Sequence, residues 1–394
     1  MIETNFKHTD IGVIPHDWEV KKLGAIYSFR YGIGNTNPNN GGKYPIYGAN
    51  GVIGGYSKYN AEDSIVIGHM GEYAGSVLWA EGKHFVTYNG TITRPKEENS
   101  INAKYGFYAL LKLNINNICA GSGYPFLAYD KLNSLKIPLP PTLAEQEKIA
   151  NALSKIDQLI NDLGALIEKK KAIKQGTMQD LLTAKRRLKG FTRKWEEARL
   201  CDLGLIIRGV SFKPEQASVD YKNGYICLLR SNNIDNARIN YENIIYVDSA
   251  CVNEYQFMRH DDILICAANG SRNLVGKAGR KIDDRLNTFG AFMCVFRCKD
   301  AKNAPFVSFL LQSNSYFKQL DEILSGSAIN NLNAKQFENM VFLTPPTFAE
   351  QNAIANILSS MDTEITNLEQ KRDKYIAIKQ GMMQNLLTGK IRLI

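Results

Sequence analysis

The sequence predicts an α+β fold: two mixed α/β domains joined by two long antiparallel helices, which form a coiled-coil spacer with approximate two-fold symmetry. Three observations support this prediction. A segment of about fifty residues occurs twice, each copy has the periodicity of a long amphipathic helix, and each copy follows a stretch patterned as short strands and turns. The expected order is therefore domain, helix, domain, helix.

The duplicated segment runs from Ile137 to Leu188 and again from Phe342 to Leu393. A single offset of 205 residues, as from Pro140 to Pro345, aligns the two copies without a gap. A register held over this length indicates a true internal duplication. We expect residues 1–137 to form the first domain, 138–190 the first spacer helix, 191–342 the second domain and 343–394 the second spacer helix.

Each copy begins with a helix start signal. A Pro pair precedes Thr142–Glu145 in the first copy and Thr347–Glu350 in the second. Both fit the capping box, in which the Thr hydroxyl and the Glu carboxylate each accept a backbone amide of the first turn. Apolar residues then alternate at spacings of four and three, which is typical of a coiled-coil seam. The predicted seam consists of Ile149, Leu153, Ile156, Ile160, Leu163 and Ile167, and of Ile354, Leu358, Met361, Ile365 and Leu368.

A long helix with a single apolar stripe needs a partner. The duplicate copy offers a matching stripe, so we expect the two helices to pack antiparallel within one chain. Two alternatives remain open at this point. Each helix could be only the last element of its own domain, or it could pair with another subunit.

Length and composition are those of an ordinary globular protein with room for two cores. The chain has 394 residues, 44% hydrophobic and 22% charged, with a net charge of +9 and a pI near 9.0. This charge permits a polyanionic partner, although the first domain carries 13 basic and 11 acidic side chains and the second 19 and 17. No apolar run reaches eighteen residues and the start lacks a signal-peptide pattern, so no membrane contact is expected. Seven scattered cysteines predict reduced thiols and a cytoplasmic location.

The two domain segments share their ends but not their middles. Trp18-Glu and Trp195-Glu are each followed by Leu five residues after the Trp, and Gly121-Ser122 recurs as Gly326-Ser327. Buried strands are expected at Ser64–Gly68 and Asp262–Ile265, and short helices near Ala103–Leu113 and Pro305–Leu324. Shared ends with divergent middles suggest one scaffold that carries two different surfaces.

Catalytic motifs are missing from the sequence as we interpret it. The loop Gly270–Ala278 resembles a phosphate-binding loop, but it has five residues between its glycines and Ala in place of the Mg²⁺-binding Ser or Thr. The Pro pairs lack the flanking residues of an amino-methyltransferase motif, and Glu19-Val-Lys21 is a common nuclease-like tripeptide without a partner. The five His residues show no metal spacing. We therefore predict no catalytic residue, no metal site and no cofactor bound by this chain.

Reading DNA requires Arg, Lys, Asn, Gln and Ser side chains on loops that face the bases, with further polar groups on the phosphates. Clusters of this kind occur in both domain middles, although Asn/Gly/Ser loops are often only turns. The candidates in the first domain are Lys43, Tyr44, Tyr47, Asn50, Lys58, His69, Tyr73, Tyr88, Asn89, Ser122 and Tyr124. Those in the second are Arg230, Asn232, Asn233, Asn269, Ser271, Arg272, Asn273, Lys277, Asn330, Asn331 and Asn333.

Taken together, these features resemble the specificity subunit of type I restriction–modification systems over essentially the whole chain. The resemblance rests on the duplicated P-P-T-x-A-E-Q … K-Q-G-x-M-Q-x-L-L-T-x-K segment, on the two Trp-Glu entries, on Tyr44–Gly51 and on Arg230–Ile234. It implies that each domain is a target-recognition domain for one half of a bipartite double-stranded DNA target, and that the helices form the spacer. It also implies partners: two methyltransferase subunits that methylate adenine N6 with S-adenosylmethionine, and two restriction subunits that use ATP and Mg²⁺.

Two other functions remain as alternatives. One is a DNA methyltransferase or nuclease that acts alone, which would show activity in the purified chain. The other is a coiled-coil adaptor without a nucleic-acid role, which would show no DNA preference.

Overall fold

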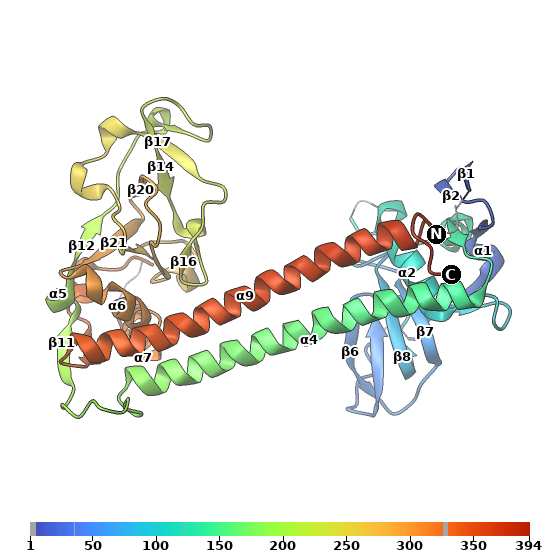
Figure 1. The fold of residues 1–394 in the computed structure, drawn as a ribbon, viewed down its shortest axis with the longest axis horizontal. Helices are drawn as coiled ribbons and strands as arrows, with labels where there is room; N and C mark the ends of the chain where they lie inside the picture. The colour runs from blue at the N-terminus through green and yellow to red at the C-terminus, as the bar shows by residue number, and fades with distance from the viewer. Residues whose placement is uncertain (1–4, 35, 122, 326–329) are drawn as a thin grey trace. The chain divides into compact units, whose positions relative to one another are not determined.

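The computed structural model describes residues 5–34, 36–121, 123–325 and 330–394, which form two compact units. Unit 1 contains Met1–Ala165 and Glu369–Ile394, and unit 2 contains Leu166–Leu368. Helices α4 (Leu143–Leu182) and α9 (Phe348–Leu386), drawn in Figure 1, each contribute one part to unit 1 and the other part to unit 2. The predicted combination of mixed α/β domains with two long helices is confirmed. Within the described residues, no helix has both the length and the apolar character needed to cross a membrane.

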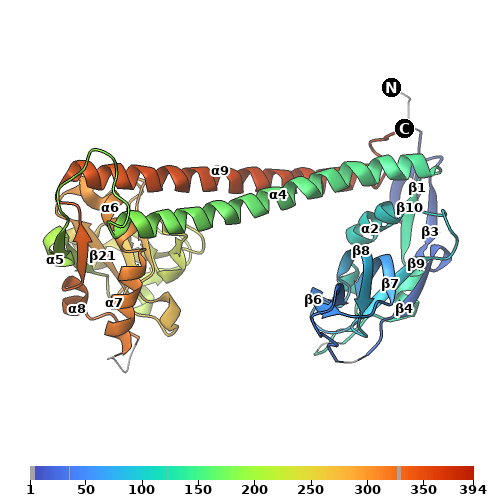
Figure 2. The same cartoon turned by 90° about the horizontal axis from the view of Figure 1, so that it is seen from below.

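Unit 1 is built around a six-stranded sheet in the order β4-β9-β7-β8-β5-β6. Its neighbouring strands are antiparallel except for the parallel pair β5 and β8, and helix α2 packs on β7 and β8 (Figure 2). The pairs β1–β2 and β3–β10 form two small ladders beside it. The elements are β1 (Phe6–Thr9), β2 (Gly12–Pro15), β3 (Glu19–Lys22), α1 (Leu23–Ile26), β4 (Tyr27–Tyr31), β5 (Tyr44–Gly48), β6 (Gly51–Tyr56), β7 (Ala61–Gly68), β8 (Val77–Val86), β9 (Gly90–Pro95), α2 (Ala103–Lys112), η1 (Ile115–Ile118), α3 (Tyr129–Ser134) and β10 (Lys136–Leu139).

Unit 2 has a six-stranded sheet in the order β12-β21-β18-β19-β16-β15 and a four-stranded sheet in the order β13-β17-β14-β20. A short ladder joins β11 to β22. The elements are β11 (Glu196–Arg199), α5 (Leu200–Leu203), β12 (Gly204–Arg208), η2 (Pro214–Gln216), β13 (Ala217–Ser218), β14 (Tyr225–Leu229), η3 (Ser231–Asn233), β15 (Ile234–Asp235), β16 (Arg238–Ile239), β17 (Ile245–Asp248), η4 (Ser249–Cys251), η5 (Glu254–Gln256), β18 (Ile263–Cys266), η6 (Arg272–Leu274), β19 (Ala278–Arg280), β20 (Asn287–Phe289), β21 (Met293–Cys298), η7 (Ala301–Asn303), α6 (Ala304–Leu310), α7 (Asn314–Ser325), α8 (Ala334–Glu338) and β22 (Val341–Thr344).

Most of the short elements expected from the sequence are present. The two buried runs form β7 and β18, and the first short helix is α2. The second expected helix, Pro305–Leu324, is divided into α6 and α7. The break has a local cause, because the Ser313 hydroxyl accepts the amide of Tyr316 (3.1 Å) and starts a new helix there.

Matching backbone hydrogen bonds show that both domains are built on the same frame. In each domain, three loops meet at the end of the central strand (β7 or β18) and are joined by equivalent amide–carbonyl pairs. These are His69–Asn89 (2.7 Å) with Ala267–Phe292 (2.9 Å), Leu127–His69 (2.9 Å) with Leu332–Ala267 (2.7 Å), and Gly71–Pro125 (2.8 Å) with Asn269–Asn330 (3.3 Å), the donor being named first. These matching hydrogen bonds therefore identify equivalent positions in the two domains, such as Asn89 in the first and Phe292 in the second.

The two long helices lie side by side and antiparallel within each unit (Figures 1 and 2). In unit 1, Lys379 of α9 pairs with Asp157 of α4 (2.6 Å). In unit 2, Lys174 pairs with Asp362 (2.6 Å). None of the eleven predicted seam residues is exposed; Ile149, Leu153, Leu163, Ile167, Ile354, Leu358 and Ile365 are buried, and Ile156, Ile160, Met361 and Leu368 are half-buried. The ends of the seam also belong to the domain cores, since Ile149 and Leu153 share a core with Trp18.

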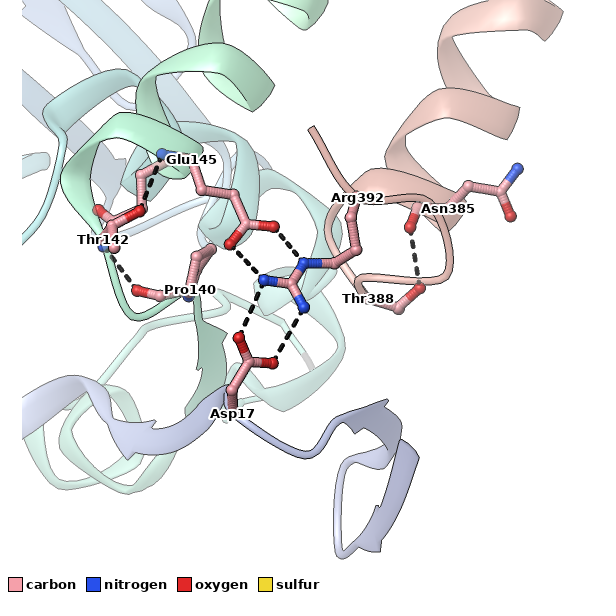
Figure 3. A network of polar contacts seen from close by, with 8 residues as sticks. Asp17, Pro140, Thr142, Glu145, Asn385, Thr388 and Arg392 are labelled. Atoms are coloured by element: carbon pink, nitrogen blue, oxygen red, sulfur yellow. Dashed lines mark hydrogen bonds and ion pairs between the residues drawn. The ribbon is translucent and has the colours of Figure 1, made fainter. Parts of the chain in front are cut away.

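The helix starts differ from the capping box that the sequence predicts. The Thr half is present, because the hydroxyls of Thr142 and Thr347 accept the amides of Glu145 and Glu350 (3.2 and 3.4 Å). The carboxylate half is replaced by an ion pair. Both Glu145 oxygens accept from Arg392, which also binds Asp17 (2.9 and 3.0 Å), as Figure 3 shows. This arginine comes from the end of the other helical repeat and holds the pKa of Asp17 below its usual value.

The same clamp occurs in unit 2. Arg187, which lies 205 residues before Arg392, donates to both oxygens of Glu350 (2.8 and 3.0 Å). Each arginine also lies over a buried indole at 5.6 Å, Arg187 over Trp195 and Arg392 over Trp18. The arginine at the end of each helical repeat therefore binds the glutamate in the first turn of the other repeat.

Candidate nucleic-acid interface

Unit 2 contains a half-open cleft of about 980 Å³ at the meeting point of three loops. Three of the polar clusters predicted from the sequence contribute a residue to its lining: Arg230, Asn269 and Asn330. These residues are up to a hundred positions apart in the chain, and the shared frame brings them together. The remaining lining is largely apolar and comes from Val210, Ser211, Phe212, Leu228, Ser231, Ile245, Ala268, Gly270, Gly290, Ala291, Phe292 and Met293.

Arg230 follows β14 and has a partly unsatisfied guanidinium. Its Nη2 donates to the carbonyl of Asn243 (2.8 Å), which fixes the direction of the side chain. Its Nε is buried and has no hydrogen-bond partner among the described residues. A buried donor without a partner is costly, so a site with such a donor is suited to a ligand that brings an acceptor.

The asparagines of the cleft connect its loops. The Asn269 amide group donates to Ser231 Oγ (3.2 Å) and accepts the Ser271 amide (2.9 Å). The Asn330 amide group donates to the Gly270 carbonyl (3.2 Å). Both side chains are half-buried, so they hold the cleft in shape and present only part of their polar surface.

Other residues predicted for unit 2 lie outside the cleft lining. Asn233 is fully buried, accepts the Arg230 amide (2.9 Å) and donates to the Glu242 carbonyl (2.9 Å), so we correct its predicted DNA contact to a structural role. Asn333 caps α8 through the amides of Lys335 and Gln336. The Arg272 side chain is tied to α7 through Asp321 (2.9 Å) and Ser325 (2.9 Å). Exposed polar residues without a place in the lining are Asn232, Ser271, Asn273 and Asn331, and Lys277 is half-buried.

Two aromatic residues of the cleft, Phe212 and Phe292, were missed by the sequence analysis, which searched for polar groups. The Phe292 side chain is 73% exposed. A large apolar residue directly after Gly290-Ala291, between two buried strands, is the signal that could have indicated it.

Unit 1 has a cluster of rings at the equivalent place. The Tyr31 ring lies 3.8 Å from His69, 4.1 Å from Tyr129 and 5.6 Å from Tyr88, measured between ring centroids. His69 is buried, its Nδ1 donates to the Leu127 carbonyl (3.0 Å), and burial lowers its pKa. We therefore correct the predicted DNA contact of His69 to a role in holding the cluster. Tyr31 and Tyr129 were missed because they lie 98 residues apart in the sequence.

Exposed rings surround this cluster. Tyr73, Tyr88 and Tyr124 are exposed, and Tyr124 lies against Gly71, where an added Cβ would meet its ring at 3.6–3.8 Å. Asn89 is exposed beside Tyr88. Ser122 and the predicted exit Gly326-Ser327 lie outside the described residues. These rings and the Asn89 amide are the groups that unit 1 presents from this part of the frame.

A second group in unit 1 is basic and aromatic. Lys43 Nζ lies over the Tyr44 ring at 4.9 Å, and Tyr44 contacts Tyr59 at 5.1 Å. Lys58 and Asn50 are exposed on the loops that end and start β6, whereas Tyr47 is half-buried against His84. Lysine ammoniums beside aromatic faces provide both charge and stacking surface, the combination that suits a nucleic-acid backbone and its bases.

The loop that resembles a phosphate-binding loop has another structure. Residues Gly270–Ala278 form a bend, the 3-10 helix η6 and the start of strand β19, rather than a strand–loop–helix unit. Among the described residues, no group of three or more His, Cys, Asp or Glu side chains is placed to hold a metal ion.

Comparison with known families identifies the class of this protein. Residues 15–175 and 192–377 match the family described as Type I restriction modification DNA specificity domain. The two matches cover most of the chain, which therefore belongs to this family.

The chain is also similar in sequence to known type I specificity subunits. The type I restriction enzyme EcoKI specificity subunit of Escherichia coli is 28% identical over 197 residues, which is 50% of this chain and 42% of that protein. The MjaVIII specificity subunit of Methanocaldococcus jannaschii is 27% identical over 425 aligned residues, covering 99% of this chain and 97% of that protein. The resemblance to type I specificity subunits that the sequence predicts is thus confirmed.

Solved structures agree on the fold. The crystal structure of a type I restriction–modification S subunit from M. genitalium matches with a TM-score of 0.66 at 18% identity and covers 98% of this chain and 97% of that one. A chain from a study of complex assembly and conformational transition of the type I system matches with a TM-score of 0.54 at 15% identity, covering 96% and 99%. At these identities the similarity concerns the fold alone.

Proposed function

We propose that this specificity subunit reads an asymmetric, bipartite double-stranded DNA target, with one half-site for each recognition domain. The observation that carries the proposal is the shared frame with unlike side chains. Around the shared backbone frame, unit 1 presents a cluster of rings and unit 2 presents an apolar cleft with Arg230. Two different surfaces on equivalent scaffolds favour two different half-sites, because direct readout depends on the side chains that face the bases.

The helices supply the spacing between half-sites in this proposal. DNA repeats about every 10–10.5 base pairs, so one extra pair rotates a half-site by roughly 35°. Helices of 40 and 39 residues, clamped at both ends by buried ion pairs, are suited to resist such a change. We therefore expect binding to be lost when one base pair is inserted between the half-sites.

The chemistry resides in partner subunits according to this proposal. Two methyltransferase subunits would use S-adenosylmethionine to methylate adenine N6, and two restriction subunits would use ATP and Mg²⁺ for translocation and cleavage. This chain would act as the non-catalytic DNA reader on which they assemble, in the cytoplasm. Each domain is only slightly basic, which fits an assembly in which the partner subunits add phosphate contacts.

Exchange of one domain tests the proposal. Residues 191–342 are replaced by the same region of a relative, and the methylated sequence is mapped in cells that carry each version. We expect one half of the methylated sequence to change and the other half to stay the same. A change in both halves, or an uninterrupted target, would contradict the assignment of one half-site to each domain.

A further inference from the structure

Phe292 is a large apolar side chain held in solvent at the rim of the unit 2 cleft. It is 73% exposed and follows Gly290-Ala291 in the turn between β20 and β21. Exposed single apolar residues are common, so exposure alone carries no argument. Phe292 differs from such residues in its position in the shared frame and in the residues beside it.

The backbone fixes Phe292 firmly. Its carbonyl accepts the amides of Ala267 (2.9 Å) and Ala268 (3.0 Å), and the Met293 amide closes the turn on the Gly290 carbonyl (2.8 Å). The turn also packs against Gly209, where an added Cβ would lie 2.0 Å from the Gly290 carbonyl oxygen. The main chain of Phe292 is therefore fixed, and its side chain stands 73% exposed beside the cleft.

The cleft beside the ring offers few hydrogen bonds. Its lining is largely apolar and includes Phe212, Leu228 and Ile245, while Arg230 and Asn269 supply polar groups. In unit 1 the frame position equivalent to Phe292 is occupied by Asn89, whose amide can donate and accept. The two domains therefore differ at this position in the kind of base edge that they can recognise.

We propose that Phe292 is a specificity-determining residue that recognises the 5-methyl group of a thymine in the half-site read by unit 2. The inference rests on the proposed function. A phenyl ring cannot hydrogen-bond a base edge, and the thymine methyl is the apolar group that the DNA major groove presents. Arg230, whose buried Nε has no partner among the described residues, lies in the same cleft, and its guanidinium can donate to base or phosphate oxygens near the thymine.

The test removes the methyl group and the ring separately. The full chain is purified with its methyltransferase subunits, and the target sequence is taken from methylation mapping, with the half-site of unit 2 assigned by the domain exchange. Binding is then measured to duplexes in which each thymine of that half-site is replaced in turn by deoxyuridine, which lacks only the methyl. For the wild type we expect one replacement to weaken binding about fourfold, as for the loss of one buried methyl group.

The variant Phe292→Ala should bind the thymine and deoxyuridine duplexes equally, both more weakly than the wild type binds the thymine duplex. Phe292→Leu, which keeps an apolar side chain, should retain part of the preference for thymine. Phe317→Ala serves as the matched control, because Phe317 is an exposed phenylalanine of the same unit that does not line the cleft. It should keep the full preference.

Several results would overturn the inference. The half-site could contain no thymine on either strand, or the wild type could bind all deoxyuridine duplexes as tightly as the original. Phe292→Ala could weaken both duplexes while keeping the fourfold difference, which would indicate a wedge between base pairs or a contact with a methyltransferase subunit. A wild-type complex without any sequence preference would instead refute the proposed function itself, so the two failures are distinguishable.

Discussion

The two recognition domains share a backbone frame and differ in what fills it. Where unit 1 places the rings of Tyr31, His69, Tyr88 and Tyr129, the equivalent positions of unit 2 carry Arg208, Ala267, Ala291 and Ala334; Tyr31 matches Arg208 because they end the equivalent strands β4 and β12, paired with Thr91 of β9 and Cys294 of β21. Three small side chains in place of three rings leave space, and Ala291 and Ala334 both line hollows in unit 2. The difference shows that small side chains on the shared frame leave hollows in unit 2 where unit 1 has packed rings.

The two helix clamps, Arg392 with Glu145 and Arg187 with Glu350, are by contrast nearly the same in the two units. Glu145 is 4% exposed and Glu350 is 1% exposed, and each carboxylate accepts two hydrogen bonds from an arginine of the other repeat. The clamps differ in the hydrogen bonding of the tryptophan beside each arginine. The Trp195 indole donates to Glu350 (3.1 Å), whereas the buried Trp18 indole has no partner among the described residues and the arginine of its clamp binds Asp17 as a second carboxylate. The clamp residues are thus nearly the same in the two units, whereas the ring cluster of unit 1 and the cleft of unit 2 carry different side chains.

The largest expected effect is the loss of a clamp. Arg187→Ala leaves the buried Glu350 carboxylate without its cation, and an unpaired buried charge typically costs about 3–5 kcal/mol. Arg392→Ala should cost a similar amount in unit 1, because Glu145 is also buried. Differential scanning calorimetry of the purified chain measures both losses. Arg186→Ala is the matched control, since Arg186 is exposed next to Arg187; an equal loss for Arg186→Ala and Arg187→Ala would rule out the clamp as a source of stability.

Proline substitutions test the two halves of the spacer separately. Ile156→Pro in the part of α4 within unit 1, and Met361→Pro at the equivalent place of α9 within unit 2, should each cost about 3 kcal/mol or more by removing a helix hydrogen bond and kinking the helix. Circular dichroism followed during chemical denaturation detects this loss. Gly164→Ala provides a control of opposite sign, because an added Cβ meets no atom within 4 Å and should stabilise α4. Unchanged stability of both proline variants would argue against the seam.

A smaller effect distinguishes two arginines within unit 2. Arg230→Ala should weaken specific binding by about 1–3 kcal/mol and relax the sequence preference if its guanidinium contacts a base. Arg272→Ala should weaken binding less, because Arg272 is bound to Asp321 and Ser325 of α7. Competition binding with specific and unrelated duplexes measures both variants in the complex with the methyltransferase subunits. Equal losses would mean that the cleft is not the reading surface.

The smallest expected effect concerns pH and separates the two units again. Burial holds the pKa of His69 and His84 below the usual 6.5 in folded unit 1. The unfolded chain therefore binds protons that the folded unit does not bind as the pH falls through about 6.5, so unit 1 loses stability in that range. Thermal unfolding at pH 7.5 and 5.5 should show the loss, and His69→Gln should reduce it. His260→Gln, at the exposed histidine of unit 2, should leave it unchanged.

Much of the architecture could be predicted because it follows from local or repeated sequence patterns. The 205-residue offset, the heptad spacing and the threonine caps depend on residues close together in the chain or copied at a constant distance. The buried strands β7 and β18 and the helix α2 follow from short apolar runs in the same way. One residue from each predicted polar cluster of unit 2 lines the cleft, and their contact with DNA stays a prediction.

The sequence by itself therefore determined the duplication, the two long helices, the two unlike domains and the family. Tertiary structure alone decided which side chains are available. It buried Asn233 and His69, exposed Phe292, and turned the glutamates of the expected capping boxes toward arginines more than 160 residues away. The physical reason is that availability depends on loops that meet in space: Arg230, Asn269 and Asn330 reach one cleft only through backbone hydrogen bonds between segments that no local pattern connects.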